Sequence, residues 1–145
     1  MAYPRLLAQV AAGGALATQV PSNFDAAAHE AMREIAARPA WRGRLDGVRE
    51  WQVHAPALYY DVLAPLATRL DIWESEYIHV LPDAAAIVEW YKGTGLRPFL
   101  DRLPDAADQQ RFLDAYLEAI AVAYPARRDG RVLFPFRRLF VVAYR

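Results

Sequence analysis

Hydrophobic positions change their spacing several times along the first part of the chain. Residues 4–12 carry an apolar helical face and end at two glycines, and residues 15–20 are apolar at nearly every position. That continuous run predicts a short strand buried on both faces. Residues 22–38 return to an i, i+4 spacing, which predicts an amphipathic helix capped by Ser22 or Asp25.

The middle of the chain continues this alternation of helix and strand. Pro56 opens a second helix, so residues 22–67 form a helical excursion between two strands. Residues 70–81 place apolar side chains on two alternating faces, which a helix cannot arrange usefully, and they predict a long strand. The large aromatic residues assigned to the core, here and in the helix that comes later, are Trp73, Tyr77, Phe112 and Tyr116.

A broken helical segment follows the long strand. Residues 84–91 have a helical pattern, residues 92–95 interrupt it with two glycines, and residues 97–103 resume it as a short helix. Asp105 is the predicted cap of a longer helix that ends before Pro125. The break at residues 92–95 is the least ordinary feature of this region.

The last segment predicts a central strand of a sheet. A turn at Asp129 and Gly130 precedes residues 132–144, which Pro135 divides, and residues 139–143 are apolar on both faces. The order of elements predicts an α/β fold, and the length of 145 residues suits a single domain over 1–145.

Composition excludes several function classes. Lys plus Arg and Asp plus Glu each number 17, so no broad charge favours nucleic acid or an anionic membrane. No apolar run approaches the roughly 18 residues of a membrane span, and the first residues make a poor signal peptide. The absence of cysteine removes disulfides and thiolate chemistry and fits a reducing cytoplasm, and the spacing of the three histidines predicts no metal site.

Five sequence blocks occur in a familiar order across almost the whole chain. They are GGALATQVPSNFD at 13–25, YYDVL at 59–63, DIWESEY at 71–77, VEWYKGTGLRPFL at 88–100 and FPFRRLF at 134–140. Together they resemble trans-aconitate 2-methyltransferases, and the fourth and fifth blocks are the most specific. The resemblance covers the C-terminal half of such enzymes.

This resemblance implies the C-terminal portion of a class I methyltransferase fold, which is Rossmann-like. The three strands then correspond to the fifth, sixth and seventh strands of a seven-stranded sheet, and they form a three-stranded mixed sheet. The last strand lies between the other two, which explains why residues 139–143 are apolar on both faces.

The family's cofactor, S-adenosyl-L-methionine, is held by an acidic strand followed by Gly-x-Gly-x-Gly. This chain has no such motif, since its one Gly-x-Gly, at residues 93–95, follows a helical pattern. We therefore expect that the chain alone does not bind the cofactor and that the first four strands of the fold are missing. The resemblance also implies no catalytic side chain, because a carboxylate is ionised at neutral pH and needs only alignment with the methyl group.

A tricarboxylate substrate such as trans-aconitate needs cationic forks and hydroxyl groups for the carboxylates that do not react. The candidate substrate-binding residues are Gln19, Asn23, His29, Tyr59, Lys92, Thr94, Arg97, Arg137 and Arg138, with Tyr60 as a further contact.

Each candidate also has a structural interpretation. Arg137 and Arg138 point to opposite faces of a strand, so at most one of them faces a given site. Residues 92–95 are either part of the site or an ordinary helix-ending turn, and Arg97 is either a ligand or a surface residue. Asn23 is either a ligand or a turn residue, His29 either touches substrate or is a surface histidine, and one of the two adjacent tyrosines belongs to the core.

Two functions remain open. The chain is either the substrate side of a trans-aconitate methyltransferase whose cofactor half is encoded upstream, lost or supplied by another chain, or a non-catalytic domain that binds carboxylates or associates. In both cases the first strand has an unpaired apolar edge, which predicts a homo-oligomer formed through that edge or through uncovered apolar faces.

Overall fold

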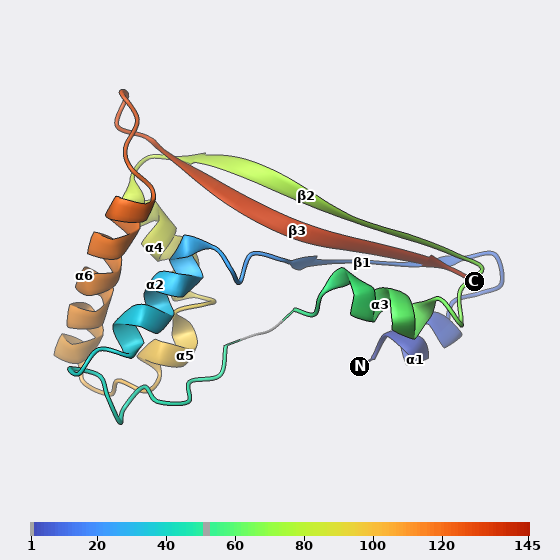
Figure 1. The fold of residues 1–145 in the computed structure, drawn as a ribbon, viewed down its shortest axis with the longest axis horizontal. Helices are drawn as coiled ribbons and strands as arrows, with labels where there is room; N and C mark the ends of the chain where they lie inside the picture. Colours follow the sequence, from blue (N-terminus) through green and yellow to red (C-terminus); the bar gives the residue numbers. More distant parts are fainter. Residues whose placement is uncertain (1, 51–52) are drawn as a thin grey trace. The chain divides into compact units, whose positions relative to one another are not determined.

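The computed structural model describes residues 2–50 and 53–145 (Figure 1). Along the chain, each strand is preceded by one or more helices. Their bounds are α1 (Tyr3–Ala8), β1 (Ala15–Pro21), α2 (Ala27–Ala36), α3 (Pro56–Leu63), β2 (Arg69–Leu81), α4 (Ala84–Lys92), α5 (Arg97–Leu100), α6 (Ala106–Ala123) and β3 (Val132–Tyr144).

The strands form one open sheet in the order β1-β3-β2. β1 pairs antiparallel with β3, in a register that joins Ala15 to Tyr144 at one end and Pro21 to Arg138 at the other. The three described strands form an antiparallel sheet and not the mixed one that the resemblance implied, because β3 lies between the two outer strands and runs opposite to both. This confirms the predicted α/β class and the central position of the last strand, which Pro135 does not interrupt.

The chain divides into two compact units. The first comprises residues 1–23, 52–77 and 136–145, and the second comprises residues 24–51 and 78–135. Each unit has its own buried side chains and is described separately. The single domain over 1–145, with a helical excursion at 22–67, stays a prediction.

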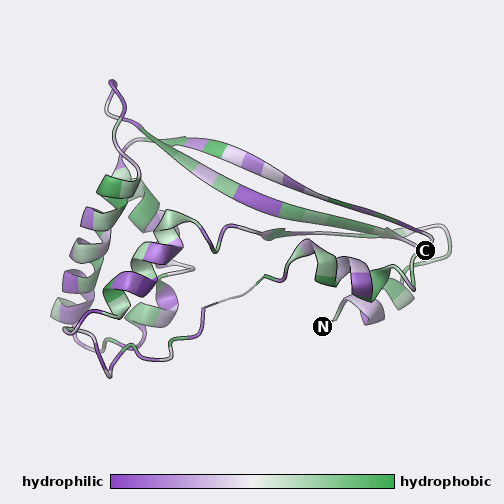
Figure 2. Cartoon of the chain, in the orientation of Figure 1, coloured by the Kyte–Doolittle hydropathy of each residue, from purple (hydrophilic) through white to green (hydrophobic). Residues whose placement is uncertain are grey.

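The core of the first unit lies between one face of the sheet and the helices α1 and α3. Leu139, Val141 and Ala143 of β3 are buried there against Tyr59 and Leu63 of α3. Their odd numbering places them on one face of the strand, and Figure 2 shows the hydrophobic run along this part of β3. Burial of this face explains why residues 139–143 carry so few polar side chains.

The other face of the same sheet is open within the described residues. Trp73 stacks on Phe140 with 5.0 Å between ring centroids, yet Trp73 is 45% exposed and Tyr77 is 44% exposed. The assignment of both to the core is therefore wrong. The alternation of a strand fixes which side chains share a face, but burial requires a second layer, and α1 and α3 cover only the opposite face.

β1 differs from its prediction for the same reason. Its side chains alternate between exposed and half-buried positions instead of being buried on both faces. Leu16 and Val20 pack against the core of the first unit, whereas Ala15 and Ala17 are exposed. The apolar run therefore predicted the position of the strand correctly, but its predicted burial on both faces is wrong.

The core of the second unit forms where α6 packs against α2 and α4. Phe112 and Tyr116 of α6 are fully buried, which confirms their assignment to the core. The Tyr116 hydroxyl donates to the carbonyl oxygen of Ala28 at 3.2 Å, and the Tyr124 hydroxyl accepts from the Ala28 amide at 3.2 Å. Two tyrosines from the region of α6 thus bond both backbone groups of one residue in α2.

Of the two caps that the sequence predicts for α2, Ser22 and Asp25, Ser22 does not form one. The helix begins after Ala26, which makes no side-chain cap, and Ser22 instead donates its hydroxyl to Glu74 at 2.6 Å. The amide of Ala28 lies in the first turn, where helix amides lack intrahelical partners, so the Tyr124 hydroxyl takes the place of a cap. The predicted cap by Ser22 is wrong because the acceptor arrives from a distant part of the chain.

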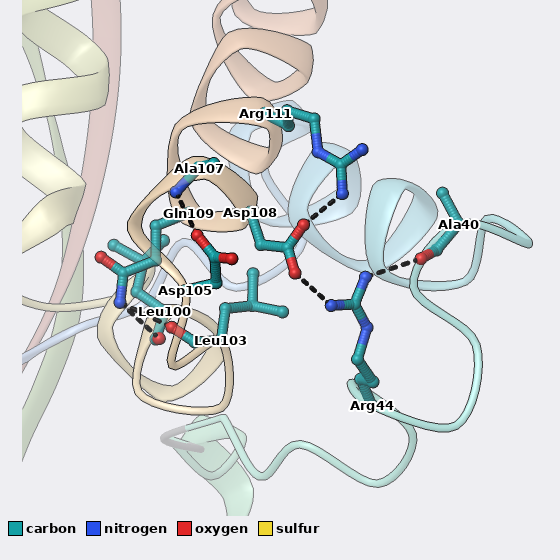
Figure 3. A network of polar contacts seen from close by, with 9 residues as sticks. All are labelled: Ala40, Arg44, Leu100, Leu103, Asp105, Ala107, Asp108, Gln109 and Arg111. Carbon is teal, nitrogen blue, oxygen red and sulfur yellow. Dashed lines mark hydrogen bonds and ion pairs between the residues drawn. The ribbon is translucent and has the colours of Figure 1, made fainter.

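The start of α6 agrees with its prediction and adds a charged cluster (Figure 3). Asp105 accepts from the Ala107 amide at 2.7 Å, which is the expected cap. Asp108 accepts from both Arg44 and Arg111, whose guanidinium groups lie 5.2 Å and 5.7 Å from the ring centroid of Trp41. Hydrogen bonds from Arg111 and then from Arg44 lower the pKa of Asp108. The cluster fixes the segment around Trp41, which the sequence left without a pattern, against α6.

Candidate functional site

The densest group of predicted site residues lies in the first unit, at the end of β1. We call it the arginine cluster: Gln19, Ser22, Glu74, Arg137 and Arg138. β1 supplies Gln19 and β3 supplies the two arginines, and the antiparallel register brings these residues together. The sequence placed Gln19 at the end of the first strand, and the sheet order places the arginines beside it.

Arg138 is held by uncharged neighbours. Its Nη1 donates to Oε1 of Gln19 at 2.6 Å, and its guanidinium carbon lies 5.1 Å from the centroid of the Phe136 ring. Residues 136 and 138 share a face of β3 by the alternation of a strand. Because Gln19 and Phe136 carry no charge, these contacts orient the guanidinium without neutralising it.

Arg137 has a different environment. Its Nε donates to the carbonyl oxygen of Ser22 at 2.7 Å and lies 3.7 Å from Oε1 of Glu74. Glu74 balances the charge of this guanidinium and also accepts from the Ser22 hydroxyl. Arg137 thus has a carboxylate beside it, whereas the contacts described for Arg138 are with the uncharged side chains of Gln19 and Phe136.

Sequence reasoning missed Glu74. It stands within the third sequence block, in a strand that was predicted from its apolar residues. Nothing in the local pattern pairs Glu74 with Arg137. The pairing depends on the neighbouring positions of β2 and β3 in the sheet. The one available signal was an acidic residue within a predicted strand that is otherwise rich in apolar residues.

A second group of polar residues lies in the second unit, around His29. This residue is only 4% exposed, so its interpretation as a surface histidine is wrong. Its ring lies 4.8 Å from the Phe24 ring and 5.1 Å from the Tyr91 ring, measured between centroids. Aromatic neighbours on two sides exclude most of the solvent from the imidazole.

Glu50 contacts two residues of α2, His29 and Arg33. Nδ1 of His29 lies 3.2 Å from Oε2 of Glu50, and Nη1 of Arg33 lies 3.2 Å from the same oxygen. A carboxylate can only accept, so Nδ1 carries the proton in this contact. Burial on its own would raise the pKa of Glu50, but the His29 hydrogen bond and the Arg33 charge outweigh it and lower that pKa. Sequence reasoning missed Glu50, which follows a segment without a clear period.

The break after α4 contributes Gly95 to this group. A β-carbon on Gly95 would lie 2.9 Å from Cδ1 of Tyr91 and 3.3 Å from Cε1 of His29. The absence of a side chain therefore allows the chain to pass over both rings. This contact brings His29 together with the fourth sequence block, as part of one packed group.

The other candidates in that block have local partners. Nζ of Lys92 lies 2.5 Å from Glu89, and Nε of Arg97 lies 3.6 Å from Asp101. The Thr94 hydroxyl donates to the Trp90 carbonyl oxygen at 3.4 Å, and α4 ends at Gly93. These contacts are those of a helix-ending turn, and both cations already have a carboxylate beside them.

Tyr59 and Asn23 are buried in the first unit. Tyr59 is 3% exposed and meets the Tyr3 ring edge to face at 5.3 Å, whereas Tyr60 is 57% exposed. Burial first, and the neighbouring Tyr3 second, raise the pKa of Tyr59. Tyr59 is thus the member of the pair that belongs to the core, and Asn23 is 3% exposed at the end of β1.

Comparison with curated proteins points to one family. The chain is 50% identical to a trans-aconitate 2-methyltransferase of Rhodopseudomonas palustris (strain HaA2) over 141 residues, which are 96% of this chain and 55% of that protein. It is 47% identical to the trans-aconitate 2-methyltransferase of Acidovorax sp. (strain JS42) over 145 residues, with 99% and 56% coverage. The corresponding protein of Yersinia pestis (strain Pestoides F), which bears the same name, is 49% identical over 144 residues, with 98% and 55% coverage.

The chain is related to the C-terminal half of the trans-aconitate 2-methyltransferases. No protein-family model matches it. The chain spans about half the length of the curated relatives that it matches. The resemblance found in the five sequence blocks is therefore confirmed at the level of the family.

The described residues do not fit the methyl donor that the name of these relatives implies. A nucleotide-binding turn needs glycine amides that approach a phosphate or ribose closely after a strand. The space beside Gly95 is filled by Tyr91 and His29, and Gly93 ends a helix with φ −81°. Gly13 and Gly14 precede β1, and their amides donate to the carbonyl oxygens of Arg145 and Ala11. None of these glycines offers a cofactor cradle.

Two further findings concern membranes and metals. None of the helices in residues 2–50 and 53–145 is both long and apolar enough to cross a bilayer. Within the same ranges, no group of three or more acidic or histidine side chains is arranged to hold a metal ion.

Proposed function

We propose that this chain supplies the substrate side of a trans-aconitate 2-methyltransferase, with Arg138 and Gln19 as its carboxylate-binding pair. The observation that carries the proposal is the hydrogen bond from Arg138 to Gln19, because this contact orients a guanidinium for which the described residues supply no carboxylate partner. The relatives named for trans-aconitate methylation support the chemical class of the ligand.

Methylation of a carboxylate requires this chain only to bind and orient the substrate. A carboxylate is ionised at neutral pH and is already a nucleophile, so no general base is required. The barrier falls when the reacting oxygen is held in line with the methyl group. Arg138 would hold a carboxylate that does not react, and Gln19 would set the angle of the guanidinium.

The methyl donor of the family, S-adenosyl-L-methionine, is outside this assignment. Since Gly13, Gly14, Gly93 and Gly95 make no cradle for it, we expect the chain alone to bind the substrate without transferring the methyl group. A second chain that carries the cofactor-binding half would complete the enzyme. We assign the protein to the cytoplasm, where this donor is available.

A non-catalytic domain is the second candidate, and the same glycine geometry favours it. Such a domain would keep the carboxylate-binding pair, or would associate with other chains without binding a substrate. The two candidates differ in whether a cofactor-binding partner restores methyl transfer.

Thermal denaturation of the 145-residue chain tests the binding assignment. Trans-aconitate should raise the melting temperature, because a ligand that binds only the folded state stabilises it, and S-adenosyl-L-methionine should not. Arg138→Gln should weaken trans-aconitate binding by roughly tenfold or more, the loss expected for a hydrogen bond to a charged group.

Arg131→Gln is the matched control. Arg131 is exposed, lies 4.0 Å from Asp129 and belongs to the second unit, so its replacement removes the same charge without changing a residue of the arginine cluster. Equal affinity in Arg138→Gln and the unmodified chain would refute Arg138 as the ligand. A melting temperature that does not respond to trans-aconitate would leave only the associating, non-binding candidate.

A further inference from the structure

One nitrogen of the buried His29 ring has no hydrogen bond within the described residues. Nδ1 lies 3.2 Å from Oε2 of Glu50, whereas no donor or acceptor in residues 2–50 and 53–145 bonds Nε2. None of the side-chain nitrogens and oxygens described is both fully enclosed and unpaired. The small exposed part of His29, 4% of the residue, therefore includes Nε2. Buried polar groups are normally paired, so this nitrogen is a candidate contact for a ligand.

The packing around the imidazole fixes the direction of this nitrogen. The rings of Phe24 and Tyr91 lie 4.8 Å and 5.1 Å from it, measured between centroids. Gly95 passes beside Cε1, the ring carbon between the two nitrogens, and a β-carbon there would lie 3.3 Å from that carbon. A side chain at residue 95 would crowd the ring next to Nε2, and glycine avoids this.

The charges around His29 leave room for one more. The charged groups beside the imidazole are Glu50 and Arg33, and Tyr91 is the other titratable side chain packed against it. The pKa of Glu50 is lowered, so its carboxylate is ionised at neutral pH, and Arg33 offsets that charge from 3.2 Å. With a neutral imidazole the group has no net charge. A proton on Nε2 gives it one positive charge and a second donor.

We infer that Nε2 of His29 binds a carboxylate of a polycarboxylate ligand such as trans-aconitate, and that a proton from the solvent joins Nε2 as the ligand binds. The inference rests on the proposed function for the class of ligand and adds a carboxylate contact in the second unit. A carboxylate only accepts hydrogen bonds, so it favours the protonated imidazole over the neutral one. Glu50 holds the other proton on Nδ1, which leaves Nε2 as the place for the added proton.

Calorimetric titration with trans-aconitate, in two buffers of different ionisation enthalpy, measures the protons taken up on binding. The unmodified 145-residue chain should take up a fraction of one proton per bound ligand at pH 7. Its affinity should fall by up to about tenfold per pH unit between pH 6 and 8, the limit for one linked proton on an imidazole. His29→Gln should remove the uptake and flatten the pH dependence.

His54→Gln is the matched control, since His54 is exposed and the variant removes the same titratable group. It should take up protons as the unmodified chain does, and the melting temperature of each variant shows whether it folds. Proton NMR tests the unmodified chain directly. At pH 7 the Cε1–H resonance of His29 should move toward its acid position as trans-aconitate is added, whereas that of His54 should not.

The outcomes separate this inference from the proposed function. Binding without proton uptake, affinity that rises with pH, or a His29 resonance that does not respond to trans-aconitate would overturn the inference alone. Proton uptake that persists while Arg138→Gln binds as tightly as the unmodified chain would refute Arg138 and support His29. A chain that does not bind trans-aconitate would refute both.

Discussion

The Nη1 of Arg138 donates to Oε1 of Gln19 across 2.6 Å, although 119 positions of the chain separate the two residues. Neighbouring strands of an antiparallel sheet bring them together. The amide of Gln19 fixes the direction of a guanidinium that also lies over the Phe136 ring. The uncharged Gln19 thus orients the Arg138 guanidinium for the carboxylate that we propose it binds.

Replacement of Gln19 tests whether this residue orients the Arg138 guanidinium. Gln19→Ala should weaken trans-aconitate binding by roughly two- to tenfold, the range expected for one neutral hydrogen bond, because Arg138 keeps its charge and loses its orientation. Calorimetric titration measures the affinity directly. Gln9→Ala removes the same side chain from an exposed position after α1 and should have no effect. A loss as large as that of Arg138→Gln would mean that Gln19 itself binds the substrate.

The glycines of the α4 break provide a matched pair for a stability measurement. Gly95→Ala should lower the free energy of unfolding by about 1–3 kcal/mol, because the new β-carbon meets the buried rings of Tyr91 and His29. Gly93→Ala has open space and a φ of −81°, so it should be neutral or stabilise by about 0.4–1 kcal/mol. Urea denaturation measures both values. Equal stabilities of the two variants would show that the break does not pack against His29.

Glu50 predicts how stability depends on pH. Its pKa is lower in the folded chain than the ordinary value of 4.5, so folding favours the ionised carboxylate. This stabilisation is complete above the pKa of the unfolded chain and is lost as the pH falls toward the folded pKa. The free energy of unfolding should therefore decrease below about pH 4.5, as measured by urea denaturation at a series of pH values.

Glu50→Gln is the control for this pH dependence. The amide keeps a hydrogen-bond acceptor for His29 but does not ionise, so the variant should lose stability at neutral pH and vary less between pH 4.5 and lower values. If the variant and the unmodified chain lose stability in parallel with acid, other carboxylates must carry the effect. Asp108, whose pKa is also lowered, is then the residue to replace next.

Local pattern determined most of the elements of this protein. The alternation in residues 70–81 predicted β2, and Asp105 predicted the start of α6, because side-chain period and helix capping involve residues close in the chain. The apolar residues 139–143 predicted the central strand, since that strand packs a hydrophobic face and has neighbours on both edges. Five sequence blocks were enough to indicate the family.

Tertiary structure alone decided the partners of the polar side chains. The cap of α2 comes from Tyr124, the charge of Arg137 is balanced by Glu74, and His29 is buried beside Glu50. It also decided burial, since Trp73 lies on a strand face that no described element covers. Periodicity fixes the direction of a side chain relative to its own backbone, whereas its partners and its burial depend on which distant segments pack against it.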